Sequence, residues 1–274
     1  MGKNNDISKI EYLVPNIGYF KSLSMFIKHG FSWGKEAGNF AFTFGDKIDV
    51  YQRVNTFYKK LELGKVRDSV LIVPEHLDQI ILLDEEIYNS KRGAKSGKNF
   101  HCDAIFTVMQ DVTIAVKAAD CDIFIIYAKN KKSQEIKGLM HAGWRGVSHM
   151  LPKKCIQFLV EKCEVNADQI LVGRLPSISK KYRTHTHFEG VNWKVEHWGA
   201  FMKKERELFH LDARGFALKQ VLEAGVRKEN IYSYELDTYV EAKKGNTFSQ
   251  KLAHELSDKG LPHVNGRYIV AIRS

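Results

Sequence analysis

Residues 115–146, AVKAADCDIFIIYAKNKKSQEIKGLMHAGWRG, decide the fold. Apolar residues alternate up to Ala118 and predict a strand that leads into Ala119-Asp120-Cys121, and the apolar run from Ile123 to Tyr127 predicts a buried strand. After a charged turn over residues 130–135, a third strand is expected over 136–140, with His141 at its end. This order predicts a hairpin that returns His141 close to Cys121 in space.

The rest of the chain mixes both kinds of element. Helical spacing of apolar residues predicts helices over 48–62, around 156–163, over 191–210 and over 213–224, the last stopped by Gly225. Short apolar or alternating stretches predict strands over 39–44, 70–73, 79–83, 103–108, 170–173, 231–236 and 268–272, and residues 88–100 are expected to form a basic loop. Because no regular βαβ rhythm appears, we expect an α+β fold with mixed or largely antiparallel sheets.

Composition places the chain among ordinary globular proteins. Its 274 residues are 44% hydrophobic and 27% charged, which is enough for a full core. We expect one catalytic domain over residues 38–274, preceded by a weakly patterned segment over 1–37. No stretch approaches the roughly 18 to 20 apolar residues that span a membrane, and the N-terminus lacks the pattern of a signal peptide. We therefore expect a cytoplasmic protein whose four cysteines are reduced.

The net charge of +10 raises the question of an acidic partner. The basic residues are dispersed, with small clusters such as Lys180 to Arg183, and none is interleaved with stacking aromatic residues. We therefore expect no nucleic acid partner, although a positive field would attract phosphate-bearing substrates. The sequence does not indicate an oligomeric state.

Chemistry is concentrated around Cys121 and His141. Their proximity suits either a shared metal ion or a Cys-His nucleophile pair. In the bend HAGWRG, Gly143 and Gly146 let the backbone approach a ligand closely, and Arg145 can grip a phosphate through two parallel hydrogen bonds.

These motifs resemble those of the laccase-domain proteins, also known as polyphenol oxidases and now regarded as zinc-dependent purine nucleoside phosphorylases. HAGWRG preceded by ADC carries the resemblance, together with the DAIFT motif that begins at Asp103 and with His76, which falls where the family has its first metal-binding histidine. Weaker matches, such as Phe248-Ser249 and Gly266-Arg267, extend it over about residues 38–272. Its strength is concentrated in residues 103–146.

The resemblance implies a zinc ion (Zn²⁺) held by His76, Cys121 and His141. It also implies phosphorolysis of adenosine, inosine and methylthioadenosine, with purine nucleoside and phosphate as substrates, and deamination of adenosine. The implied fold is a sandwich of packed β-sheets flanked by helices, similar to the catalytic domain of cytotoxic necrotizing factor toxins. Two imidazoles and one thiolate leave a fourth position for water or substrate, as in catalytic zinc sites. Within this scheme we expect catalytic roles for Cys121, for Asp120 as a hydrogen-bonding or acid–base neighbour, and for Arg145 as the phosphate contact.

Several positions depart from the family pattern. Pro74 replaces a glutamine two residues before the first histidine, and Ile123 replaces the proline that follows ADC. Gly173-Arg174 stands in place of Gly-Pro, and Asp237-Thr238 in place of Cys-Thr. Residues 249–252, Ser-Gln-Lys-Leu, replace Ser-Tyr-Arg-Arg. We expect these changes to affect which substrate the protein binds.

Two other functions remain open at this point. The ligand set of two histidines and one cysteine is also that of trigonal copper sites, which allows a copper-dependent polyphenol oxidase. True multicopper oxidases need several His-x-His pairs, and this chain has one, His185-Thr186-His187, which we expect to form a solvated polar turn. The second alternative is a degenerate metal-binding homologue without turnover.

Overall fold

Strands β9 (Asp122–Lys129) and β10 (Glu135–Ala142) form the long hairpin predicted from the sequence. They pair antiparallel along their full length, from Glu135 opposite Lys129 to Ala142 opposite Asp122. The computed structural model of the chain describes residues 10–14, 16–34, 36–186 and 195–273. In β9, odd-numbered residues such as Ile123 pack into one core and even-numbered residues such as Phe124 into another. Burial on both faces explains the uninterrupted apolar run.

Two large mixed sheets contain most of the strands. The six-stranded sheet has the order β15 (Ile231–Ser233), β11 (Leu171–Arg174), β9, β10, β7 (Ala104–Thr107) and β5 (Ile80–Leu83). The seven-stranded sheet has the order β1 (Ile10–Val14), β2 (Ile17–Phe20), β3 (Lys28–Ser32), β16 (Tyr268–Arg273), β8 (Ile114–Ala118), β4 (Val70–Val73) and β6 (Lys98–His101). Each sheet combines antiparallel and parallel pairs, as the α+β prediction requires.

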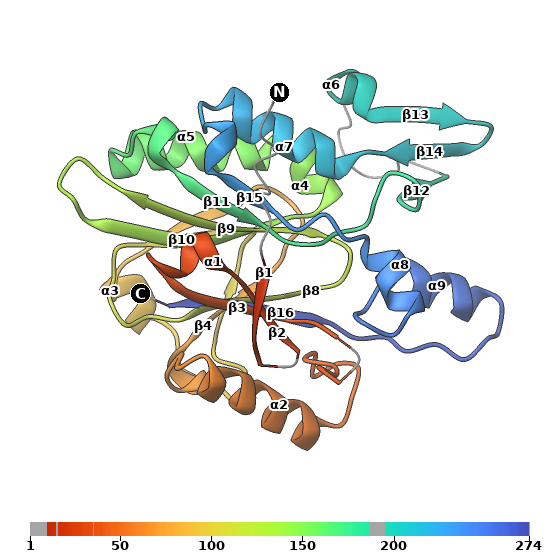
Figure 1. Cartoon of the computed structure of the whole chain (residues 1–274), viewed down its shortest axis with the longest axis horizontal. Helices are drawn as coiled ribbons and strands as arrows, with labels where there is room; N and C mark the ends of the chain where they lie inside the picture. Colours follow the sequence, from red (N-terminus) through yellow and green to blue (C-terminus); the bar gives the residue numbers. More distant parts are fainter. Residues whose placement is uncertain (1–9, 15, 35, 187–194, 274) are drawn as a thin grey trace, which may run out of the picture.

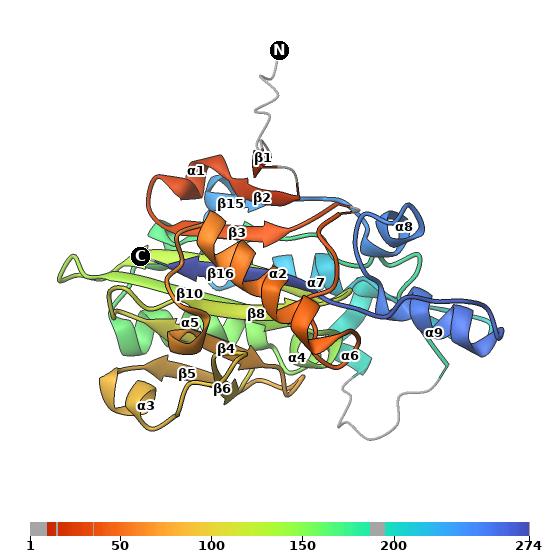
Figure 2. The same ribbon diagram turned by 90° about the horizontal axis from the view of Figure 1, so that it is seen from below.

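Helices cover the outer faces of both sheets, giving four layers (Figure 1). Helices α4 (Trp144–Ser148), α5 (Leu151–Cys163) and α7 (Ala213–Glu223) lie on the six-stranded sheet, and their apolar faces share a core with it. Helix α2 (Lys47–Lys60) crosses the outer face of the seven-stranded sheet (Figure 2). A third core fills the space between the sheets. The predicted single-domain sandwich is therefore confirmed.

Smaller elements complete the described structure. Helices α1 (Lys21–Ser24) and α3 (Glu85–Asn89) are single turns near the sheet edges. Helices α8 (Thr238–Lys243) and α9 (Gln250–Asp258) lie together beside the ends of the sheets (Figure 1). The weakly patterned N-terminal segment contributes β1, β2 and β3, and β3 pairs with β16 inside the seven-stranded sheet. The basic loop predicted over 88–100 ends in strand β6. Within the described residues, no helix has the length and apolar character needed to cross a membrane.

The helix predicted over 191–210 is confirmed only over its single turn at Val195–Trp198, and from residue 202 onward the prediction is wrong. Residues 191–194 lie outside the described residues, and α6 (Val195–Trp198) is a single turn. Strands β13 (Met202–Glu205) and β14 (Leu208–Leu211) follow and pair antiparallel, and β12 (Thr184–His185) joins them in a small third sheet. The turn between β13 and β14 places Arg206 at a φ of 54°, which is incompatible with a right-handed helix.

The strand predicted over 39–44 is also wrong. Phe40 is buried against Phe57 of α2, and its backbone N–H donates to the Arg267 carbonyl, but no described strand pairs with residues 39–44. The Asn39 side chain accepts hydrogen bonds from the backbone N–H groups of Ala41 and Arg267. The alternating aromatic residues therefore belong to a loop that packs on α2. The Asn39 side chain accepts the backbone hydrogen bonds that a neighbouring strand would accept in a sheet.

Candidate metal centre

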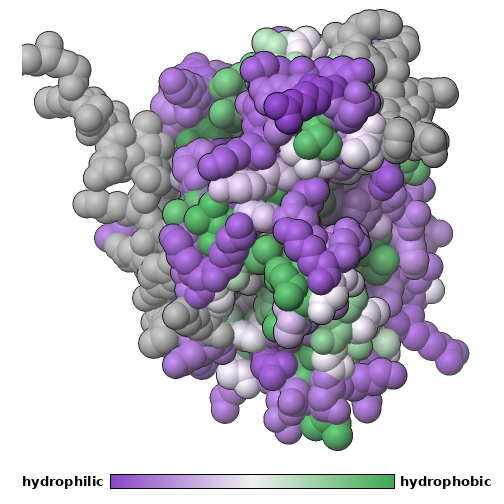
Figure 3. Space-filling view, turned by 90° about the vertical axis from the view of Figure 1, so that its right-hand side faces the viewer, coloured by the Kyte–Doolittle hydropathy of each residue, from purple (hydrophilic) through white to green (hydrophobic). Residues whose placement is uncertain are grey.

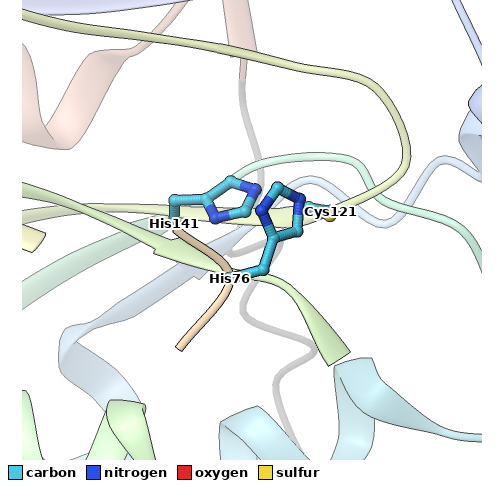
Figure 4. Close-up of side chains that lie close together, drawn as sticks. All are labelled: His76, Cys121 and His141. Carbon is cyan, nitrogen blue, oxygen red and sulfur yellow. The ribbon is translucent and has the colours of Figure 1, made fainter. Parts of the chain in front are cut away.

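The three predicted ligands come from three separate strand ends. His76 lies three residues after the end of β4, Cys121 lies in the turn between β8 and β9, and His141 is the penultimate residue of β10. Because His141 pairs with Ile123 across the hairpin, its ring is held next to Cys121. The structure brings one ligand atom from each side chain within 4.8 Å of the others (Figure 4). His76 and Cys121 are half-buried, and His141 is buried.

Asp103, one residue before β7, organises both histidines. Its carboxylate accepts hydrogen bonds from the backbone N–H groups of His76 at 2.9 Å and Leu77 at 2.8 Å. It also lies 3.4 Å from Nδ1 of His141. His76 has a φ of 61°, an uncommon backbone conformation that these two hydrogen bonds hold in place. In the sequence Asp103 stands out only as the first residue of the DAIFT motif, and no local signal indicates this role.

Each histidine uses Nδ1 for a contact within the protein. Nδ1 of His141 faces the Asp103 carboxylate, and Nδ1 of His76 lies 3.2 Å from the Pro74 carbonyl oxygen. An Nδ1–H donated to these acceptors leaves each Nε2 as a lone-pair donor for a metal. The two rings meet edge to face, with centroids 4.9 Å apart. Orientation, donor set and spacing therefore fit a single metal ion.

The electrostatics of the cluster favour the thiolate form of Cys121. Burial alone raises the pKa of the thiol, but the charge of His141 and hydrogen bonds from His141 and His76 outweigh burial and hold that pKa well below its usual value. Burial likewise lowers the pKa of His141, whereas the neighbouring Cys121 and Asp103 charges raise it to about 9. A thiolate is the form of cysteine that binds metals, and a metal ion bound here would take the place of the proton on His141.

Gly143 forms a wall of the cluster. A Cβ at this position would lie 3.2 Å from Cε1 of His141, 3.4 Å from Cδ2 of His76 and 3.5 Å from Sγ of Cys121. Its backbone is extended, with a φ of −62°, so an added methyl group would meet a tight contact with the His141 ring rather than backbone strain. The close backbone approach expected for this bend is thus directed at all three ligands.

The cluster opens into a pocket of about 420 Å³. Five cationic side chains line the pocket and are called the pocket cations below: Lys117, Arg145, Arg183, Lys251 and Arg267. Asp120 is the one carboxylate residue that lines it among the described residues. Arg145, the predicted phosphate contact, is the second residue of α4 and lies over the Trp144 ring at 4.8 Å. The pocket is therefore strongly positive.

Asp120 faces the C-terminal part of the chain. Its carboxylate accepts hydrogen bonds from Oγ1 of Thr238 at 2.6 Å, from Oγ of Ser249 at 3.0 Å and from the backbone N–H of Lys251 at 2.8 Å. Its backbone carbonyl accepts a hydrogen bond from Arg183. Burial raises the pKa of Asp120 despite these donors. Asp120 thus joins the Cys121 turn to two of the pocket cations.

His185 and Trp144 form an aromatic wall of the pocket. Their ring centroids are 4.6 Å apart. Burial, followed by the charges of Arg183, Lys251 and Arg145, lowers the pKa of His185 to about 4, so this ring is neutral at pH 7. The prediction of a solvated turn is wrong for His185, which lies in β12, and His187 lies outside the described residues. Long-range packing placed Arg183 and His185 here, and no local signal in the sequence revealed it.

The departures from the family pattern have structural roles. Arg174 is 2% exposed and lies between Asp122, at 3.8 Å, and Glu235. Asp237 caps α8 by accepting the N–H groups of Tyr239 and Val240. Gln250 lines the pocket. Its side-chain oxygen accepts a hydrogen bond from Arg267 at 2.6 Å, and its side-chain nitrogen contacts His254. Arg174 and Asp237 therefore act within the protein structure, whereas Gln250, like Pro74 and Lys251, lines the pocket.

Comparisons with known proteins agree with this architecture. The sequence model of a family described as multi-copper polyphenol oxidoreductase laccase matches residues 27–257. A protein of Aquifex aeolicus (strain VF5) named purine nucleoside phosphorylase is 28% identical over 225 residues, which cover 77% of this chain and 91% of that protein.

Solved structures show the same fold. The hypothetical protein YfiH of Bacillus licheniformis superposes with a TM-score of 0.75 at 17% identity, covering 96% of this chain and 98% of its own. YlmD of Geobacillus stearothermophilus gives a TM-score of 0.72 at 18% identity, covering 97% and 99%. At these identities the likeness is one of fold alone.

Proposed function

Because this chain belongs to the multi-copper polyphenol oxidoreductase laccase family, we propose that it is a zinc-dependent purine nucleoside phosphorylase. Its substrates are inorganic phosphate and a purine nucleoside such as adenosine, inosine or methylthioadenosine. One observation carries the proposal: the His76–Cys121–His141 cluster opens into a pocket whose charged side chains are almost all cations. The name of the relative from Aquifex aeolicus supports the same activity.

The metal fits the donor set that the chain presents. Two imidazole nitrogens and one thiolate form a three-ligand set that leaves one tetrahedral position open. Zinc bound there supplies a Lewis acid to an oxygen of water or substrate. The described residues bring together one cluster of this kind, which suits one ion. Zinc rather than copper is our proposal, and metal analysis of the purified protein distinguishes the two.

Phosphate binding falls to the pocket cations. Arg145 projects from the bend that also holds Gly143, so it is tied closely to the metal cluster. Arg183 and Arg267 act electrostatically on Cys121 or respond to its charge, which places them near the cluster. Guanidinium groups bind phosphate oxygens through paired hydrogen bonds, and partial burial strengthens them. Arg145 is the primary phosphate contact in this proposal.

The aromatic wall is suited to the purine. Trp144 and the neutral His185 ring offer flat, largely apolar surfaces beside the cations. Phosphorolysis passes through a transition state in which positive charge develops on the ribose. The phosphate held by the pocket cations supplies the compensating negative charge and attacks C1′, while the purine leaves with the bonding electron pair. Cys121 takes part as a metal ligand, and Asp120 positions the turn that carries it.

Deamination of adenosine is the second activity that the same site supports. The observation that favours it is the three-ligand set, because a water in the fourth position would be activated for attack on the purine ring. Inosine formed from adenosine without phosphate identifies this reaction. Adenine together with ribose 1-phosphate, formed only with phosphate, identifies phosphorolysis.

The deciding experiment incubates the purified zinc-loaded protein with adenosine and phosphate. We expect adenine and ribose 1-phosphate, and loss of both zinc and turnover in Cys121→Ala. Cys163→Ala is the matched control, because Cys163 is a buried cysteine at the end of α5, remote from the pocket lining. Turnover retained by Cys121→Ala contradicts the proposal. Zinc binding without turnover of any purine nucleoside supports a metal-binding protein without this activity.

A further inference from the structure

The pocket carries more positive charge than one phosphate neutralises. Four of the pocket cations, Lys117, Arg145, Arg183 and Arg267, have no carboxylate within 4.0 Å among the described residues. The fifth, Lys251, lies 3.4 Å from Glu255 in the next turn of α9. The Asp120 carboxylate is already used by two hydroxyl groups and a backbone N–H. Four of the five pocket cations therefore have no ion-pair partner among the described residues, although the charges of Asp120 and Cys121 act on Arg183 and Arg267.

The charge balance of the pocket favours a ligand set with more than one anionic group. The Asp120 carboxylate and the Cys121 thiolate offset two of the five cationic charges, and inorganic phosphate, with about two negative charges near pH 7, offsets about two more. A metal ion held by one thiolate adds further positive charge to the same pocket. Like charges gathered in a partly buried pocket repel one another, so a second anion would bind there favourably. A neutral nucleoside does not provide one.

The cations also extend across the whole pocket. Arg183 and Arg267 interact electrostatically with Cys121 at the metal end. Arg145, Arg183 and Lys251 all act on His185 at the aromatic wall. The molecular face on the side of α8 and α9 is largely hydrophilic as well (Figure 3). Two phosphate groups at different distances from the metal cluster would match this distribution better than one.

We propose that the nucleoside substrate carries a phosphate of its own, so that the pocket takes purine nucleoside 5′-monophosphates. This inference rests on the proposed phosphorylase function and extends its substrate class from nucleosides to nucleotides. The pocket volume of about 420 Å³ falls within the range of roughly 300–1,000 Å³ typical of small-molecule sites. The 5′-phosphate and the attacking phosphate share the pocket cations between them.

The reaction balances without another reactant. An oxygen of inorganic phosphate forms the new bond to C1′, and the C1′–N9 bond breaks with its electron pair going to N9. The proton of hydrogen phosphate ends on the purine. The products are the free base and ribose 1,5-bisphosphate.

Binding of inosine and inosine 5′-monophosphate to the zinc-loaded protein tests the inference. Isothermal titration calorimetry without phosphate prevents phosphorolysis, and inosine has no amino group to lose. We expect the nucleotide to bind at least about tenfold more tightly at low salt. Raising the salt concentration should reduce this difference, because screening weakens the charge interactions.

Two variants with opposite expected effects locate the second anion. Lys251→Gln removes one pocket cation but keeps the backbone N–H that holds Asp120, so we expect the preference for the nucleotide to fall severalfold. Glu255→Gln removes the competing carboxylate, and its side-chain oxygen still accepts from Tyr239, so the preference should rise. Lys131→Gln is the control of equal charge, because Lys131 is exposed in the turn at the far end of the β9–β10 hairpin.

The outcomes separate the inference from the function on which it rests. A protein that binds and cleaves inosine but binds the nucleotide no more tightly overturns the inference and leaves the phosphorylase proposal intact. A protein that binds neither compound overturns both. Tighter nucleotide binding that is insensitive to Lys251→Gln and Glu255→Gln also contradicts a second anion held by the pocket cations.

Discussion

The carboxylate of Asp103 lies 3.4 Å from Nδ1 of His141 and simultaneously accepts the backbone N–H of His76. One buried side chain therefore fixes the ring of one metal-ligand candidate and the backbone of another. Asp103 is fully buried, so water does not compete for these contacts. This arrangement makes Asp103 the residue on which the geometry of the cluster depends.

Asp103→Asn should weaken zinc binding by roughly 10- to 100-fold, the usual effect of losing a partner of a metal-bound histidine. The amide keeps the shape of the carboxylate but loses its charge, and one end of it donates rather than accepts hydrogen bonds. Competition with a zinc chelator measures the affinity. Asp168→Asn, which removes an exposed carboxylate paired with Arg227, should bind zinc normally. Equal affinity in the two variants would refute the role of Asp103.

Gly143→Ala should reduce zinc affinity by at least about tenfold, because the new methyl group lies against all three ligands. The backbone conformation at Gly143 suits alanine, so we expect the thermal unfolding temperature of the metal-free protein to change little. Chelator competition should therefore show the loss of zinc affinity, whereas thermal unfolding of the metal-free protein should show almost no change. A large fall in the unfolding temperature, with zinc affinity preserved, would contradict this packing of Gly143 against the ligands.

The sequence predicted the centre of the fold well because its elements are defined by local pattern. Helices α2 and α5 carry apolar residues at helical spacing, and β9 is an almost uninterrupted apolar run. Residues 39–44 and 202–211 were predicted wrongly. Residues 39–44 pack on α2, and residues 202–211 pack near α7. Such packing produces apolar spacing that resembles the spacing of a strand or a helix, so the local pattern was misleading.

The His76–Cys121–His141 cluster was predictable in part, and the pocket was not. Cys121 and His141 are joined by one hairpin, so sequence order placed them together. Arg183 and Lys251 approach Cys121 through hydrogen bonds to Asp120 from positions more than 60 residues away. The spacing of apolar residues along the sequence does not indicate contacts between such distant positions. In the sequence, Lys180 to Arg183 is therefore one small basic cluster among several, although Arg183 lines the pocket.

His29 should make the protein less stable in acid. Burial lowers the pKa of His29 to about 4, and its Nε2 accepts the backbone N–H of Phe20. In the unfolded chain the pKa is about 6.5, so the unfolded state binds the proton first as pH falls. The stabilisation is complete above pH 6.5 and is lost towards pH 4, with a maximum loss of about 3 kcal/mol. Urea unfolding at several pH values measures it, and His29→Gln should have a smaller slope over this range. Identical slopes would contradict the assignment.

The Asp122–Arg174 pair should behave as a buried ion pair. Both side chains are 2% exposed, and Asp122 also accepts a hydrogen bond from Ser177 at 2.6 Å. Burial raises the pKa of Asp122, and the Arg174 charge opposes that rise. Arg174→Leu removes this charge and also the closer contact of Arg174 with Glu235, so it should destabilise the protein by about 3 kcal/mol or more. Arg174→Leu combined with Asp122→Asn should recover part of this loss. Chemical unfolding of the single and double variants provides the test, and strictly additive losses would exclude coupling.

The ligand shell of zinc in the reconstituted protein tests the central claim most directly. X-ray absorption spectroscopy distinguishes sulfur from nitrogen or oxygen neighbours. We predict one sulfur at about 2.3 Å and two imidazole nitrogens at about 2.0–2.1 Å, with the sulfur signal absent in Cys121→Ala. A spectrum without sulfur, or one that Cys121→Ala leaves unchanged, would contradict the assignment of His76, Cys121 and His141 as the metal centre.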